Sequence, residues 1–176
     1  MNWYLLLLVP VGLFVALNMY IRRSLAPERI PETGDPGDLP WREVGLPTHN
    51  GKRLFAWYIP AAQRGPALVI MHGWGGNAQM MLPLAEPLHA AGYSLLMVDA
   101  RCHGRSDMDR FTSLPRFAED IEAALDWLAV QPEADPALLG VIGHSVGAGA
   151  ALLVASRRPS LRVVVSLAAF AHPAAM

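Results

Sequence analysis

Short apolar runs that alternate with helical segments constrain the fold of this chain more than any other feature of its sequence. The runs are nearly continuous, which is typical of strands that helices cover on both faces of a parallel sheet. Alternation of such strands with helices is the pattern of βαβ units, so the sequence predicts an α/β fold with a mostly parallel sheet. The four buried strands predicted in this way cover Ala67–Met71, Tyr93–Val98, Leu138–Ile142 and Arg162–Leu167.

An antiparallel hairpin is expected to open the sheet, because Asn50-Gly51 lies between two strand-like segments, 41–48 and 53–59. Helices are expected between the later strands. Three are predicted: one over Asn77–Ala91 that Pro83 and Pro87 interrupt, one that Ser113 caps and that ends before Pro132, and an Ala- and Gly-rich one over Val146–Arg158.

Residues 1–23 are predicted to form a transmembrane anchor. Trp3–Ile21 contains no Asp, Glu, Lys or Arg, and as a helix it would reach about 28 Å, near the thickness of a hydrocarbon core. A cleaved signal peptide and a buried core helix are the alternatives. Arg22, Arg23 and Arg29 follow the apolar run and nothing basic precedes it, which predicts a single pass with the C-terminal part in the cytoplasm.

Residues 24–40 are rich in Pro, Gly and acidic residues, a composition that does not support helices or sheet ladders. We expect a spacer that holds the next domain near the membrane and leaves it free to rotate. The domain itself is predicted to cover residues 41–176.

Composition excludes several classes of function. The formal net charge is -1, so no basic field is present to attract nucleic acid. The single cysteine, Cys102, excludes an intramolecular disulfide and a cysteine-based zinc site. The six histidines show no metal-binding spacing, and we expect neither a metal nor a cofactor.

A candidate nucleophile lies in the sequence Gly-His-Ser-Val-Gly at 143–147. This segment directly follows a predicted buried strand and opens a predicted helix, which is the context of a nucleophile elbow. Ser145 would be exposed on a strained turn, and glycines two residues on either side would prevent collision with neighbouring backbone. A glycine-rich turn that serves only packing or a phosphate site is the alternative, although no phosphate-binding motif is present.

A candidate oxyanion hole involves residues 72–77, His-Gly-Trp-Gly-Gly-Asn, which end another predicted strand. Acyl-transfer enzymes of this type stabilise an anionic tetrahedral oxygen with two backbone N–H groups. We assign them to Trp74 and to Val146, the residue after the serine, each worth on the order of 3 kcal/mol of barrier. His72 is expected to form structural hydrogen bonds, and a plain glycine loop is the alternative.

With Asp-Ala-Arg-Cys-His-Gly-Arg-Ser at 99–106, these motifs resemble the α/β-hydrolase superfamily, and within it the serine aminopeptidase S33 or monoacylglycerol-lipase-like branch. The branch has glycine where this chain has Cys102, which we expect to be a small packed residue. The resemblance covers residues 41–176. It implies a serine hydrolase that cleaves an ester, thioester or amide through an acyl-enzyme on Ser145. A small-molecule or lipid-like acyl substrate is expected.

The other two members of a catalytic triad are missing from the sequence. No Asp or Glu follows Ser145, and His172 is the only later histidine, although the family order is serine, acid, histidine. His172 follows the sixth strand too closely to be the base. We therefore expect a fragment of a longer hydrolase, truncated after its sixth strand. The alternative is a non-catalytic, membrane-anchored interaction module with an open sheet edge.

Overall fold

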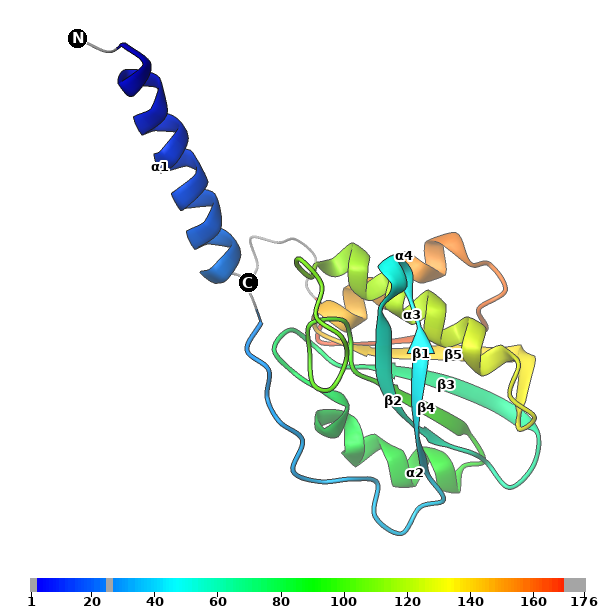
Figure 1. The fold of residues 1–176 in the computed structure, drawn as a ribbon. Coiled ribbons are helices and arrows are strands. Elements are labelled where there is room, and N and C mark those ends of the chain that lie inside the picture. Colours follow the sequence, from blue (N-terminus) through cyan, green and yellow to red (C-terminus); the bar gives the residue numbers. More distant parts are fainter. Residues whose placement is uncertain (1–2, 25–26, 170–176) are drawn as a thin grey trace.

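A six-stranded sheet forms the centre of the computed structural model, which describes residues 3–24 and 27–169 (Figure 1). The strand order is β1-β2-β4-β3-β5-β6. The strands are β1 Arg42–Pro47, β2 Arg53–Ile59, β3 Gly65–Met71, β4 Ser94–Val98, β5 Ala134–His144 and β6 Val163–Leu167.

Strands β4, β3, β5 and β6 are parallel, whereas β1, β2 and β4 pair antiparallel. The predicted mostly parallel sheet with an opening hairpin is therefore confirmed. The turn of the hairpin, η1 (His49–Gly51), needs left-handed backbone at Asn50 and Gly51, where φ is 60° and 65°. Asn-Gly favours this conformation because both residues tolerate positive φ.

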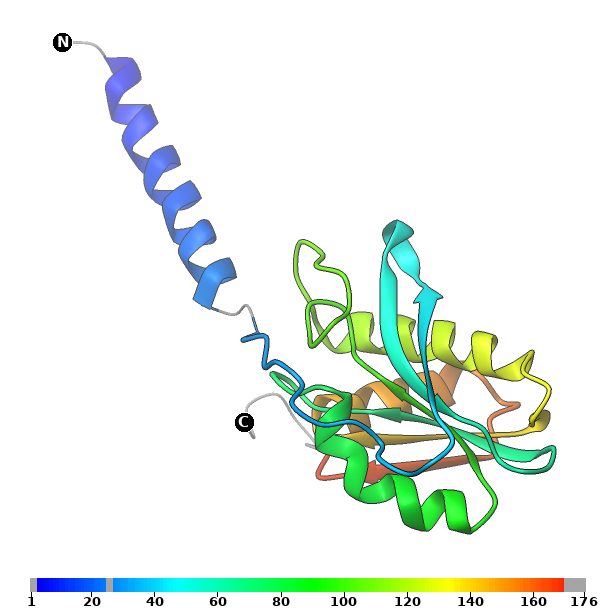
Figure 2. The same cartoon turned by 60° about the horizontal axis from the view of Figure 1, so that its bottom comes forward.

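Helices cover both faces of the sheet (Figures 1 and 2). α3 (Leu114–Ala129) and α4 (Val146–Arg157) lie on one face, and η2 (Ala78–Leu84) with α2 (Ala85–Ala90) lie on the other. In β2, Leu54, Ala56 and Tyr58 pack on the α3 side and Phe55, Trp57 and Ile59 on the α2 side. Because side chains alternate between the two faces along a strand, β2 supplies core residues to both faces of the sheet.

Two helix expectations need correction. The helix expected over Asn77–Ala91 splits into the 3₁₀ segment η2 and the short α2, because Pro83 lies inside the segment and lacks the N–H of an α-helical bond. Ser113 occupies the N-cap position of α3, but its side chain forms no capping hydrogen bond.

The N-terminal segment forms helix α1 (Trp3–Ser24), which stands apart from the sheet (Figures 1 and 2). Within the described part of the chain, no helix combines the length and the apolar character needed to cross a membrane. The predicted transmembrane anchor is therefore not supported.

Residues 27–40, which we call the strap, have no helix or strand, as expected. They are nevertheless not free to rotate. The Arg29 guanidinium donates to the carbonyls of Gly104 at 2.6 and 2.9 Å and of Ser106 at 2.7 Å. Further along, Gln79 Oε1 accepts the backbone N–H groups of Thr33 and Gly34 at 2.6 and 3.0 Å. The strap is thus fixed to the loop after β4 and to η2.

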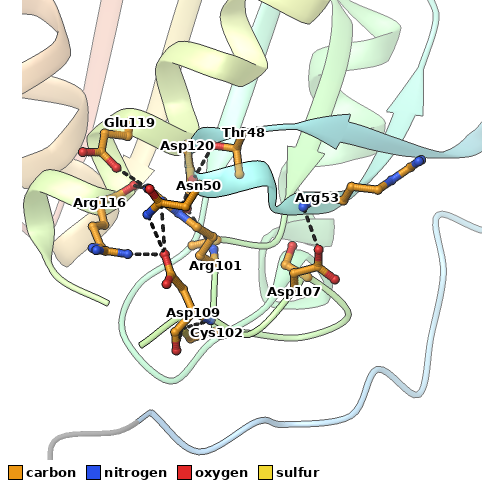
Figure 3. Close-up of polar contacts among 12 residues, drawn as sticks. Thr48, Asn50, Arg53, Arg101, Cys102, Asp107, Asp109, Arg116, Glu119 and Asp120 are labelled. Carbon is orange, nitrogen blue, oxygen red and sulfur yellow. Dashed lines mark hydrogen bonds and ion pairs between the residues drawn. The ribbon is translucent and has the colours of Figure 1, made fainter. Parts of the chain in front are cut away.

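A buried arginine joins α3 to the loop after β4 (Figure 3). Arg101 is fully buried and its Nε lies 2.8 Å from Oδ1 of Asp120, which is also fully buried. The other Asp120 oxygen accepts the backbone N–H of Arg101 at 2.8 Å, and Thr48 donates to Oδ1 at 3.0 Å. Asp109 lies 3.5 Å from the same guanidinium. The charges are therefore compensated within the core.

Replacing Arg101 by methionine should lower the free energy of unfolding by about 3–5 kcal/mol, because Asp120 would remain buried without its cation. Urea unfolding followed by circular dichroism measures this loss. The matched control is Arg158→Met, which breaks the pair with the 70% exposed Asp126 and should cost less than about 1 kcal/mol. Equal losses in the two variants would contradict this account of the network.

Candidate active site

Ser145 lies in the sharp turn between β5 and α4, at the carboxyl end of the parallel strands. Its φ of 52° and ψ of -115° are unfavourable for a residue with a side chain, and such strain persists only where the surroundings impose it. The Ser145 N–H donates to Leu167 O of β6 at 2.8 Å. The predicted strand, turn and helix context of Ser145 is therefore confirmed.

Glycines allow three backbone segments to approach each other around this turn. A Cβ on Gly143 would lie 2.2 Å from the carbonyl oxygen of Gly147, and a Cβ on Gly147 would lie 2.3 Å from that of His72. A Cβ on Gly73 would lie 3.1 Å from the Cβ of Ser145. The glycine spacing is thus required by the close contact of the serine turn with the loop after β3.

That loop, residues 72–76, is called the oxyanion loop below. The N–H of Trp74 donates to no acceptor in the part of the chain that the structure describes. Val146 is the first residue of α4, so its N–H has no acceptor within the helix. Among the described residues, both N–H groups assigned from the sequence are therefore without a hydrogen-bond acceptor.

His72 fixes the Gly73–Trp74 peptide of the oxyanion loop. Its Nε2 lies 3.0 Å from the backbone N–H of Ala100, so Nε2 is the acceptor and Nδ1 carries the proton. Nδ1 lies 2.6 Å from the carbonyl of Gly73 and donates to it. Burial lowers the pKa of His72 to about 3, so the ring is neutral. The expected structural role of His72 is confirmed.

His103 contacts the same loop. Its Nε2 accepts the backbone N–H of Gly75 at 3.1 Å, and its Nδ1 lies 2.9 Å from the carbonyl of Arg101. Burial lowers the pKa of His103, and the nearby charge of Arg29 lowers it further. The ring packs edge-on against Phe117 of α3, with centroids 5.1 Å apart. The sequence analysis did not assign a role to this histidine.

The segment 99–106 forms a closed loop around the carboxylate of Asp99. This carboxylate accepts the backbone N–H groups of Ala78 and Arg105, each at 2.7 Å. A Cβ on Gly104, whose φ is +43°, would lie 2.0 Å from Asp99 Oδ2. Ser106 Oγ closes the loop by donating to the carbonyl of Asp99 at 2.6 Å. These residues of the motif therefore position backbone and need not contact a substrate.

Cys102, the departure from the family pattern, has a φ of +67°. Left-handed backbone explains why glycine is usual there. The Cys102 side chain is 2% exposed, and its Sγ accepts the N–H of Asp109 at 3.3 Å (Figure 3). The expectation of a small packed residue is confirmed.

Glu32 of the strap is a further residue that the sequence analysis missed. Its side chain is 6% exposed. Burial and the adjacent Asp99 raise the pKa of Glu32 to about 8. No local pattern reveals this contact, because the two residues are far apart in sequence.

Other candidate groups are absent from the site. Among residues 3–24 and 27–169, no three His, Cys, Asp or Glu side chains gather as metal ligands would. The exposed His144 lies next to Ser145 and beside Gly73. His172 lies outside the described residues.

Comparison with known proteins identifies the family. The family model for serine aminopeptidase, S33 matches residues 62–176. An uncharacterised protein of Mycobacterium tuberculosis is 36% identical over 126 residues, which cover 70% of this chain and 44% of that protein. The thiohydrolase apmlB of Arthrinium phaeospermum is 31% identical over 133 residues, 71% of this chain and 42% of its own length.

A solved structure leads to the same family. The Pyrococcus furiosus esterase Pf2001 superposes with a TM-score of 0.73 at 26% identity, over 81% of this chain and 57% of the esterase. This chain spans less than half the length of the two curated relatives above. The fold, the serine turn and the family match agree, and the chain belongs to the serine aminopeptidase S33 family of α/β hydrolases.

Proposed function

We propose that the protein is a serine hydrolase that forms an acyl-enzyme on Ser145. The observation that carries this proposal is the strained serine turn beside two free backbone N–H groups, those of Trp74 and Val146. A tetrahedral oxyanion needs donors that are fixed before the reaction starts. The oxyanion loop and the first turn of α4 supply such donors.

The chemistry proceeds in two stages. Ser145 Oγ attacks the carbonyl carbon of the substrate, a general base takes the hydroxyl proton, and the carbonyl oxygen becomes an anion that both N–H groups bind. Collapse of this intermediate expels the leaving group, which receives the proton, and the acyl group stays on Ser145. Water then attacks the acyl-enzyme through the same oxyanion site, releasing the carboxylic acid and restoring the serine.

The general base and its acidic partner are assigned to no described residue. The sequence has no Asp or Glu after Ser145, and the relatives are longer than this chain. Activity is therefore proposed for the natural gene product, and its measurement requires that product.

Esters and thioesters are the proposed substrates. Support comes from the thiohydrolase and the esterase to which the chain is similar. Trp74 of the oxyanion loop is 43% exposed, and Met80 is 59% exposed. Met80 Sδ would lie 2.9 Å from a Cβ on Gly76, so its side chain is beside this loop. These side chains offer an apolar surface for an acyl group; amides remain a further substrate class.

The Ser145→Ala variant of the natural gene product should lose at least about 10³-fold in kcat on an aryl ester and on an aryl thioester, because no acyl-enzyme can form. Release of the phenol or thiol, followed by absorbance, measures the rate. The control is Ser156→Ala, on the exposed side of α4, which should keep wild-type rates. If the wild-type product were inactive on every acyl substrate, the non-catalytic module would replace this proposal.

The location of the protein is a separate part of the proposal. The uncharged run Trp3–Ile21 supports attachment to a membrane, with the hydrolase domain on the cytoplasmic side. Large apolar side chains from Leu8 to Ile21 are 45–71% exposed in α1. Exposed apolar surface of this kind favours a lipid or protein partner.

The natural gene product should sediment with membranes and resist extraction at alkaline pH, because the apolar helix would be embedded. A variant without residues 1–23 should be found in the soluble fraction. Immunoblotting of both fractions checks this expectation. Wild-type protein that is soluble, or released by alkaline carbonate, would contradict a membrane-embedded helix.

A further inference from the structure

A cavity of about 650 Å³ lies between the strap and the first two strands of the sheet, within the volume range of small-molecule sites. The strap supplies one wall, and the hairpin and the loop after β4 supply the others. The lining residues are 29–35 of the strap, Trp41 before β1, Glu43 of β1, Trp57 of β2, and Gly104 and Arg105. None of them belongs to the serine turn or to the oxyanion loop, so the cavity is a second candidate site.

Two polar side chains of this cavity are buried without a hydrogen-bond partner. The Glu32 side chain is 6% exposed, and its Oε1 forms no hydrogen bond with any described residue. Trp57 is 2% exposed, and its indole N–H likewise has no acceptor in the described part of the chain. By contrast, the indole N–H of Trp41 donates to Gly37 O at 3.2 Å. Because buried polar groups are normally paired, the two unpaired atoms indicate a ligand that bonds to both.

The two cations of the cavity are already engaged elsewhere. Arg105 Nη2 donates to Glu43 Oε2 at 2.8 Å, whereas Arg105 Nη1 lies 3.9 Å from Glu32 Oε2. Arg29 donates through Nε and Nη2 to backbone carbonyls. Among the described residues, neither guanidinium is therefore within hydrogen-bond distance of the Glu32 carboxyl group.

The charges around Glu32 favour an added cation. Glu32, Asp35 and Glu43 line the cavity against two guanidinium groups, and Asp99 is a further acid next to Glu32. Burial and Asp99 raise the pKa of Glu32 to about 8, and the attraction of Arg105 offsets this only in part. A ligand cation beside Glu32 would stabilise its ionised form.

Two tryptophan rings form the aromatic wall of the cavity. The centroids of Trp41 and Trp57 are 6.3 Å apart, with their planes at 72°. Indole faces attract cations and offer apolar contact to the rest of a ligand. An oxygen of the same ligand can accept the unpaired N–H of Trp57, which is only a donor.

We propose that the cavity between the strap and the hairpin binds a small organic ammonium compound. Its ammonium group donates to Glu32, its apolar part contacts Trp41 and Trp57, and a hydroxyl or carbonyl oxygen accepts the N–H of Trp57. Binding at this site does not require acyl transfer on Ser145. An inactive hydrolase would therefore leave the proposal standing, and the two can fail separately.

Phenylalaninol carries an ammonium group, a hydroxyl group and an apolar ring, and is the probe. Titration calorimetry of the natural gene product at neutral pH should show one bound molecule per chain. The matched control ligand is the diol in which a hydroxyl group replaces the ammonium group, and it should bind at least about tenfold more weakly. No binding of phenylalaninol at millimolar concentration, or equal affinity for the diol, would overturn the proposal.

The Glu32→Gln variant should bind phenylalaninol no more tightly than wild type binds the diol, because the amide carries no charge. The control is Glu86→Gln on the exposed side of α2, outside this cavity, which should keep wild-type affinity. Wild-type affinity in Glu32→Gln would contradict the assigned contact.

Proton release gives a readout on the unmutated protein. The ammonium group should lower the pKa of Glu32, so binding at neutral pH should release a proton from a carboxyl group whose pKa is about 8 before binding. The apparent binding enthalpy should then vary with the ionisation enthalpy of the buffer, and affinity should increase as the pH rises from neutral toward that pKa. Binding without proton release would overturn the proposal, because the ligand would then not lie beside Glu32.

Discussion

The rest of the site depends on one close backbone contact at the carboxyl end of the sheet. There the end of β5, the start of α4 and the loop after β3 meet. Gly143 and Gly147 allow the serine turn to close, and Gly73 allows the oxyanion loop to lie against Ser145. Any Cβ at 143 or 147 would collide with backbone, which cannot move aside as a flexible side chain can. The strained φ and ψ of Ser145 accompany this contact.

The polar residues around this contact maintain the position of the backbone and keep charges compensated. His72 and His103 hold two successive peptides of the oxyanion loop. Asp99 holds the loop after β4 through two backbone N–H groups. Arg101 joins that loop to α3 through Asp120. The strap adds a further attachment at Gly104 and Ser106. Most of the side chains that support the site, His72, Asp99, Arg101 and Asp120, are therefore fully buried.

The elements that a few consecutive residues determine could be predicted from the sequence. Nearly continuous apolar runs located the parallel strands, and Gly-His-Ser-Val-Gly located the serine turn, because both signals lie within a few consecutive residues. Long-range contacts were not predictable. The strap has the composition of a free linker, yet Arg29 reaches carbonyls 75 and 77 residues away. The acceptor role of His103 likewise depends on a loop from another strand.

The central claim is that Ser145 is a nucleophile activated beside the two N–H groups. Fluorophosphonate labelling of the natural gene product, followed by intact mass and peptide mapping, tests it most directly. The account predicts one adduct per chain, on the peptide that contains Ser145, and none in the Ser145→Ala variant. An adduct on another residue, or no adduct on the natural product, would contradict it.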